Sequence, residues 1–281
     1  MRLACLVVAA ACGSSHAKPD AAVPPRCDPT AQFGAPIAVA GLDTAGDELG
    51  ARLTPDELVV VFAFAATAGG KLDLYTAARA TADAAFGTPV PLGAVNSVYD
   101  DSSPALSPDQ LLLFLDSDRG ATGMPHIYAS ARPSIAAAFG PPTAAVALSD
   151  GETTPMLANA GALYFASDVR PGLGMHDLWR ADVDATGATG TPAAVPGMVD
   201  TSDDEQAPAV TPDELAIYFE RTTAAGTGIY EATRTSAGDP FGAPVVVASM
   251  AAAPSWISPD QCDLYFDAPG VGQDVFLATR E

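Results

Sequence analysis

The chain has 281 residues, 48% of them hydrophobic and 17% charged, which is enough to bury a full core in one large domain or two small ones. Its 34 acidic and 13 basic residues give a formal charge of -21, which repels phosphate groups and excludes DNA or RNA as a partner. The 25 glycines and 25 prolines favour many short strands joined by turns over long surface helices.

The first segment of the chain has the pattern of an export signal. One arginine precedes an apolar stretch over residues 3–11, which is too short to span a bilayer, and small residues stand directly before Cys12. The run AAAC at 9–12 resembles the lipobox of bacterial lipoproteins. This resemblance implies a signal peptide over residues 1–11 and a lipid on Cys12. An ordinary secretory signal cut near Ala17 is the alternative.

A tether is predicted over residues 12–30. From Ser14 to Thr30 the sequence is rich in proline, alanine and serine and has no periodicity, which is typical of an extended linker. The folded body then covers residues 31–281. Gly13 after the lipidated cysteine implies, by resemblance to bacterial sorting rules, an outer-membrane lipoprotein that faces the periplasm or the cell surface.

The folded body contains an internal repeat built on a Pro-Asp turn. Four clear copies and one degenerate copy follow each other at intervals of 53, 51, 53 and 47 residues, a period typical of propeller blades or a solenoid. Proline sets φ for a tight turn and aspartate bonds nearby backbone amides, so we interpret these residues as architecture. They are Pro55, Asp56, Pro108, Asp109, Pro212, Asp213, Pro259 and Asp260, with Asn159 in the degenerate copy.

Three strand patterns recur around each turn. An apolar strand that ends in aromatic residues follows the turn directly, as in 163–165 (LYF). A second strand carries an apolar and an aromatic residue, as in 127–128 (IY), and in four copies it continues to an arginine. A third element begins with Phe-Gly, as at Phe139. The sequence therefore predicts several strands per repeat.

The order of these elements predicts how the fold closes. The chain begins with a Phe-Gly element at Phe33 and stops after the aromatic strand at Phe276, so the last blade lacks an outer strand that residues 33–42 can supply. We therefore expect an all-β, five-bladed β-propeller of four-stranded blades, closed by the N-terminal strand completing the last blade. This closure brings Cys27 near Cys262 and predicts a disulfide in an oxidising compartment, with two unrelated buried thiols as the alternative.

The repeat S/T-P-D-x-L, followed by D-[ILV]-[YFW]-x-A-x-R, resembles the TolB-type, Pro-Asp variant of the WD-like β-propeller repeat found in bacterial envelope lipoproteins. The resemblance covers residues 33–281 and implies scaffolding and protein binding in the envelope. The third blade departs from the pattern, because it has neither the Pro-Asp turn nor the terminal arginine.

A carboxylate recurs near the start of four of the five predicted inner strands. Inner strands line the channel of a propeller, so these carboxylates would meet at one mouth of the channel. Oxygen ligands from flexible loops suit Ca2+, which makes calcium the candidate cofactor. A solvated acidic rim that repeats with the blades is the alternative. The four predicted metal ligands are Asp47, Asp101, Glu152 and Glu205.

These features predict a lipid-anchored envelope propeller that binds a protein or a glycan, and the alternative is a glycoside hydrolase-like enzyme that uses propeller carboxylates. A hydrolase needs unique carboxylates beside exposed aromatic residues, whereas these acids recur in phase and aromatic residues make up only 7% of the chain. We therefore assign no catalytic residue and predict that the protein is not an enzyme. A closed propeller has no free edge to pair, so a monomer is expected.

Overall fold

The computed structural model describes residues 26–120, 122–159, 161–270 and 272–281. Twenty strands and no helix are found in these ranges, so no described helix could cross a membrane. The predicted signal peptide and the predicted lipidation site, Cys12, lie outside the described residues.

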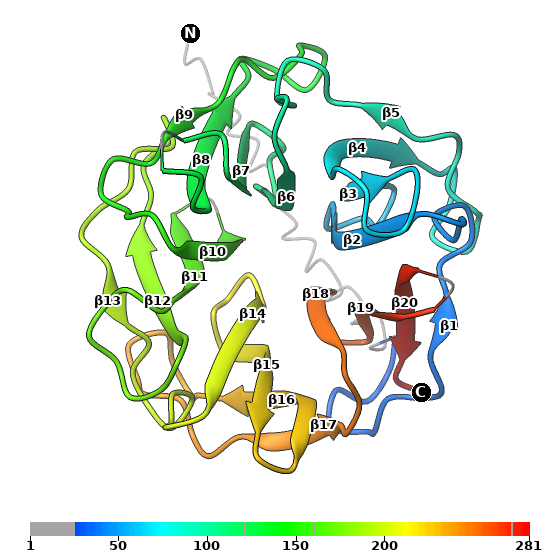
Figure 1. Cartoon of the computed structure of the whole chain (residues 1–281). Coiled ribbons are helices and arrows are strands. Elements are labelled where there is room, and N and C mark those ends of the chain that lie inside the picture. The colour runs from blue at the N-terminus through cyan, green and yellow to red at the C-terminus, as the bar shows by residue number, and fades with distance from the viewer. Residues whose placement is uncertain (1–25, 121, 160, 271) are drawn as a thin grey trace, which may run out of the picture.

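The strands form five antiparallel sheets of four strands each, arranged as blades around a central axis (Figure 1). In four blades the chain starts at the axis and moves outward strand by strand, and in the fifth it does so for three strands. Aromatic side chains of the second strands are among the largest fully buried groups, and they pack between neighbouring blades. The structure thus confirms the prediction of an all-β propeller with five blades.

Four blades are built from four consecutive strands. The first two are β2 (Asp47–Leu53), β3 (Val59–Ala65), β4 (Asp73–Ala78) and β5 (Val90–Pro91), then β6 (Asp101–Leu106), β7 (Leu112–Ser117), β8 (His126–Ala131) and β9 (Thr143–Ala144). The third and fourth are β10 (Glu152–Asn159), β11 (Ala162–Ser167), β12 (Asp177–Asp182) and β13 (Ala193–Ala194), then β14 (Asp204–Val210), β15 (Ala216–Thr223), β16 (Gly226–Thr233) and β17 (Val245–Ala248).

The fifth blade joins the two ends of the chain, as predicted. It consists of β18 (Ala253–Ile257), β19 (Asp263–Pro269), β20 (Gln273–Thr279) and, as its outer strand, β1 (Ile37–Ala38). A disulfide links Cys27 to Cys262, whose Cα atoms lie 5.7 Å apart across 235 residues of sequence. The predicted disulfide is therefore confirmed.

The Pro-Asp turn owes its shape to a short hydrogen-bond network. In the first blade Thr54 Oγ1 donates to Asp56 Oδ1 at 2.5 Å, and the same carboxylate oxygen accepts from the N–H of Leu58 at 3.1 Å. The residue after the aspartate has a positive φ, 60° at Glu57, and the same holds for Gln110, Glu214 and Gln261. Each predicted turn aspartate thus organises its own turn.

A stacked arginine explains the recurring Phe-Gly element. The guanidinium of Arg280 lies 4.1 Å from the ring centroid of Phe33, and Nη1 donates to the turn carbonyl of Gln261 at 3.1 Å. Three other blades repeat the stack at 4.3–4.4 Å, with the pairs Arg79 and Phe86, Arg132 and Phe139, and Arg234 and Phe241. The ring covers the arginine that caps the turn.

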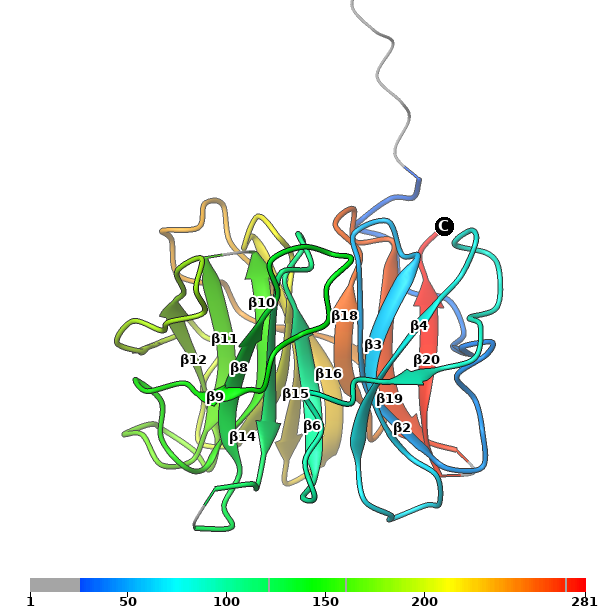
Figure 2. The same ribbon diagram turned by 90° about the horizontal axis from the view of Figure 1, so that it is seen from above.

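The two faces of the propeller carry different segments (Figure 2). The Pro-Asp turns, the C-terminus and the entry of the chain at Arg26 lie on one face, where Arg26 pairs with Asp260 at 2.9 Å and with Asp263 at 2.6 Å. The inner strands β2, β6, β10, β14 and β18 begin on the opposite face, which we call the channel-mouth face.

Candidate functional site

Three of the four carboxylates predicted as metal ligands hold equivalent buried positions on the channel-mouth face. Asp101, Glu152 and Glu205 have an exposed fraction of 0%. Each forms an ion pair with an arginine of its own blade, and Arg221 Nε lies 2.7 Å from Glu205 Oε1. The other pairs are Arg119 with Asp101 and Arg170 with Glu152. An arginine therefore already balances each of these charges.

Asp47, the fourth predicted ligand, stands one residue away from the equivalent position. The inner strands of the first four blades each have an irregularity at a residue with positive φ, which is Gly50 (64°) in the first blade and Ser103 (46°) in the second. Counting back from this residue puts Glu48, which is also fully buried, in the equivalent place. Asp47 instead accepts hydrogen bonds from the backbone N–H groups of Gly69 and Gln273, at 2.6 and 2.9 Å.

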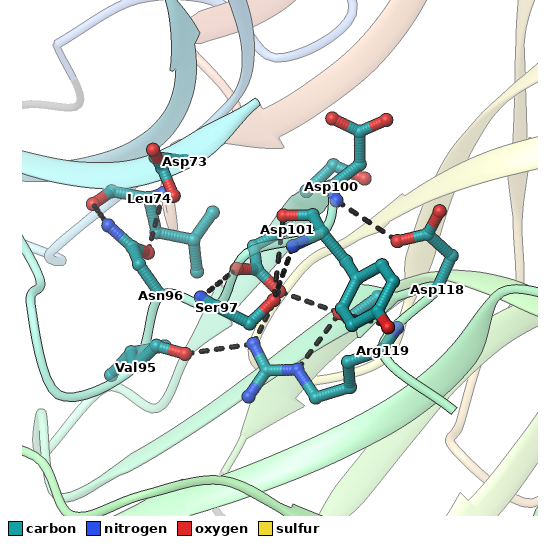
Figure 3. A network of polar contacts seen from close by, with 12 residues as sticks. Asp73, Leu74, Val95, Asn96, Ser97, Asp100, Asp101, Asp118 and Arg119 are labelled. Atoms are coloured by element: carbon teal, nitrogen blue, oxygen red, sulfur yellow. Dashed lines mark hydrogen bonds and ion pairs between the residues drawn. The ribbon is translucent and has the colours of Figure 1, made fainter. Parts of the chain in front are cut away.

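The surroundings of Asp101 show what these recurring carboxylates do (Figure 3). Its oxygens accept hydrogen bonds from the N–H of Ser97 at 2.5 Å and from the hydroxyl of Ser117 at 2.6 Å, and they contact Arg119. Arg119 also donates to the carbonyl of Val95 at 2.8 Å. Asp101 thereby fixes the loop that leads into its own inner strand.

One acidic group on this face could hold a metal ion. Within the described ranges, the only cluster of three or more possible ligands joins Asp177, Asp200 and Glu205, whose ligand atoms lie within 4.8 Å of one another. Glu205 is the single member that was predicted. Calcium binding by Asp47, Asp101, Glu152 and Glu205 together stays a prediction.

Burial raises the pKa of Asp200 to about 7, and the charges of Asp177 and Glu205 add to the rise. The N–H of Leu178 donates to Asp200 Oδ1 at 2.9 Å. The first blade has Asn96 in this role, with its amide bonded to both the N–H and the carbonyl of a single residue, Leu74, at 2.8 and 3.0 Å. A protonated Asp200 would carry an O–H donor, as the amide of Asn96 carries the N–H that donates to the carbonyl of Leu74.

Replacing Asp200 by Asn is therefore expected to raise Tm at pH 8 by roughly 2–4 °C, the shift that about 1 kcal/mol produces in a domain of this size. The folded pKa of about 7 lies above the ordinary value of 3.8, so the wild-type protein loses stability as the pH rises from about 4 to about 7. The variant should lose this slope. Thermal melts between pH 4 and pH 8 in a chelator check it, and Asn96→Asp, the reverse exchange, should lower Tm at pH 8.

A second set of carboxylates does not recur around the ring. Asp116, Glu220 and Asp267 occupy one equivalent position on the second strands of the second, fourth and fifth blades, where they pair in register with Ser102, Gln206 and Ala253. The first and third blades have alanine at this position, Ala63 and Ala166. Three blades out of five thus carry an acid at this position, so this set differs from blade to blade.

Two of these acids tie their blade to the next one. Asp267 Oδ2 accepts a hydrogen bond from the N–H of Gly50 at 2.8 Å, and Asp116 Oδ2 accepts one from the N–H of Thr154 at 3.0 Å. The matching residue in front of Glu220 is Pro254, which has no N–H group to donate. No hydrogen bond to the side chain of Glu220 is found in the described part of the chain, and this side chain is partly exposed.

The electrostatics of this set favour proton transfer near neutral pH. Burial raises the pKa of Asp267 to about 7, against the opposing effects of the Gly50 hydrogen bond and of Arg52, and the charge of Glu220 adds to the rise. Burial also raises the pKa of Glu220, with a further contribution from Asp204. Raised carboxyl pKa values with a specific charged neighbour are typical of functional sites.

Sequence reasoning missed these three acids. Each one directly follows the apolar strand that was predicted immediately after a turn, in the runs 115–116 (LD), 219–220 (FE) and 266–267 (FD). A comparison of the five repeats at that single position would have shown an acid in three copies and an alanine in two.

Solved structures with the same architecture include glycoside hydrolases. The α-L-arabinofuranosidase of Podospora anserina, solved with cellotriose, is 14% identical over 90% of this chain and 98% of its own, with a TM-score of 0.55. A family 117 glycoside hydrolase of Zobellia galactanivorans is 11% identical over 89% of this chain and 90% of its own, with a TM-score of 0.57.

A protein described as TolB from Agrobacterium tumefaciens also shares the fold. It is 15% identical over 82% of this chain and 73% of its own, with a TM-score of 0.51. No protein-family profile matches the sequence, and neither does any curated protein. At these identities the comparisons show the fold alone, which agrees with the TolB-like resemblance of the repeat at the level of a propeller.

The prediction that the protein is not an enzyme is corrected by these comparisons. The prediction rested on acids that recur in phase with the blades of a propeller. Solved glycoside hydrolases have the same propeller fold. The recurring acids prove to be paired with arginines, while the acids that do not recur lie on second strands, where the repeat pattern concealed them.

Proposed function

We propose that the protein is an exported enzyme of the glycoside hydrolase type, with its site at the centre of the channel-mouth face. One observation carries this proposal. Asp116, Glu220 and Asp267 come from three different blades, and their charges act on Arg52 or on one another.

Glycoside hydrolysis uses one carboxylic acid to protonate the leaving oxygen and one carboxylate as nucleophile or base. Asp267 suits the acid, because a pKa of about 7 keeps it protonated at and below neutral pH. Glu220 suits the second carboxylate, because its side chain is partly exposed and has no hydrogen bond in the described part of the chain. Asp116 positions the third blade through the N–H of Thr154.

The predicted lipid anchor is compatible with this site. The chain enters the propeller at Arg26, on the face opposite the channel mouth (Figure 2). A lipid on Cys12 would therefore tether the face that carries the Pro-Asp turns, and it would leave the channel mouth free for a glycan. We propose an envelope location, with glycans of the cell surface or its surroundings as substrates.

Hydrolysis of a panel of chromogenic aryl glycosides, including α-L-arabinofuranosides, by the full chain tests the proposal. An acid with a pKa of about 7 must be protonated to act, so activity should fall about tenfold for each pH unit above 7; it should also fall on the acid side, where Glu220, whose pKa is raised, becomes protonated. Activity that rises through pH 7 to pH 9 would contradict Asp267 as the acid. Glycan binding without turnover in every member of the panel would contradict the enzyme.

A further inference from the structure

One outer strand of the propeller is longer than the other four. Closing the ring leaves each blade with an outer edge, and the outer strands β1, β5, β9 and β13 have two residues each. β17 has four, with the sequence VVVA, and it lies at the perimeter of the fourth blade (Figure 1). In the described part of the chain β17 pairs only with β16, so its other edge has no strand partner.

This edge lacks the usual protection against pairing. Proteins cover or shorten an edge strand, or place charged residues and proline on it, because a free edge can pair with another extended chain. β17 carries neither a charge nor a proline, and Val245 and Val246 have exposed fractions of 59% and 55%. The edge of the fourth blade is therefore open to an additional strand.

An open groove of about 680 Å³ adjoins β17. Its lining includes residues 245–247, the segment 29–33 that leads into the fifth blade, and polar side chains such as Glu231 and Gln261. Successive side chains of a strand point to opposite faces of the sheet, so a groove lined by three consecutive residues reaches the edge of the strand. Its volume lies within the range of about 300–1,000 Å³ that is typical of ligand sites.

The charges around the groove favour a basic partner. Among the described residues Arg280 is the only cation of the lining, and it pairs with Glu231 at 3.1 Å and stacks on the ring of Phe33. Asp28 and Glu281, which adjoin lining residues in the chain, are exposed. The net charge of -21 attracts basic chains and repels a second copy of the protein.

We propose that this groove binds an extended segment of a basic partner protein, which adds a strand to the fourth blade along β17. Main-chain hydrogen bonds to the free edge would supply affinity, and alternate side chains of the segment would fill the groove. The segment would carry lysine or arginine beside β-branched residues, which suit an extended conformation. The groove lies at the perimeter of the propeller, so this role does not depend on the proposed hydrolase function.

Selection of a phage library of random twelve-residue peptides on the immobilised full chain tests the site. The selected peptides should be rich in lysine, arginine and β-branched residues. They should bind Val246→Lys at least tenfold more weakly than the wild-type protein, because a charge on an edge strand opposes pairing.

The matched control is Val90→Lys, which makes the same exchange on the two-residue strand β5, at a residue with an exposed fraction of 58%. It should leave the affinity within about twofold of the wild-type value. A library without binders, or peptides that bind Val246→Lys and Val90→Lys equally, would overturn the proposal.

Backbone methylation of a selected peptide gives a second test that needs no variant. Two copies are methylated on alternate backbone nitrogens, one in each register, so that their side chains and charge stay the same. Only one edge of the bound strand pairs with β17, so one register should lose at least tenfold in affinity and the other should not. Equal binding of all three peptides, measured by fluorescence anisotropy, would contradict strand addition even where Val246→Lys does not fold.

Discussion

Glu220→Gln is expected to lower kcat/KM on a cleaved glycoside by about 10²–10⁴-fold, the contribution of a positioned acid or base. Glutamine keeps the shape of the side chain and removes the charge. Because no hydrogen bond to the side chain of Glu220 is found in the described part of the chain, Tm should stay within about 2 °C. Steady-state kinetics and thermal melts of both proteins check this expectation.

The matched control is Asp83→Asn, which removes a carboxylate from an exposed loop at the rim of the first blade. It should leave kcat/KM unchanged. Equal losses in Glu220→Gln and Asp83→Asn would mean that the total charge of the protein matters and not the channel mouth.

Asp267→Asn separates catalysis from stability at the same site. Asparagine can still accept the N–H of Gly50, and it removes an acid whose pKa of about 7 makes its ionised form unfavourable in the folded state. The wild-type protein therefore loses stability between about pH 4 and pH 7, and the variant should melt higher at pH 8 while its activity falls. A variant that loses both activity and stability would identify Asp267 as a structural residue.

Removal of the disulfide is expected to have the largest effect on stability. Replacing Cys27 and Cys262 by serine should lower Tm by roughly 5–15 °C, because the bond closes a loop of 235 residues and such bonds contribute about 2–5 kcal/mol. The junction of β1 with β20, where the two ends of the chain meet, depends on this bond, since β1 has only two residues, of which Ile37 pairs with Leu277.

Reduction provides the control for this prediction. Dithiothreitol should lower the Tm of the wild-type protein to that of the double serine variant and should not change the variant. Arg26, Asp260 and Asp263 are unchanged in both proteins, so the loss of their ion pairs by substitution does not contribute to the difference in Tm. Identical melting of the oxidised and reduced wild-type protein would contradict the role of the bond.

The architecture could be predicted because a recurring Pro-Asp turn marks most of the blades in the sequence. Pro55 and Asp56 return as Pro108 and Asp109 at the expected distance, and the structure shows why, since the aspartate holds the backbone of its own turn. The register inside a strand was harder to predict. Asp47 was chosen in place of Glu48 because Gly50 was matched with a proline, and the bulge that decides the count is a backbone conformation that no residue type reveals reliably.

The sequence by itself determined the number of blades, the closure by the N-terminal strand and the disulfide, because these depend on local turn chemistry and on the order of repeated elements. Only the tertiary structure decided which acids belong together. Closing the ring brings acids that are far apart in the chain within electrostatic reach of one another: Asp116 and Asp267 act on the buried Arg52, and Glu220 acts on Asp267. Burial and mutual charge, which set their pKa values, exist only after the five blades have packed.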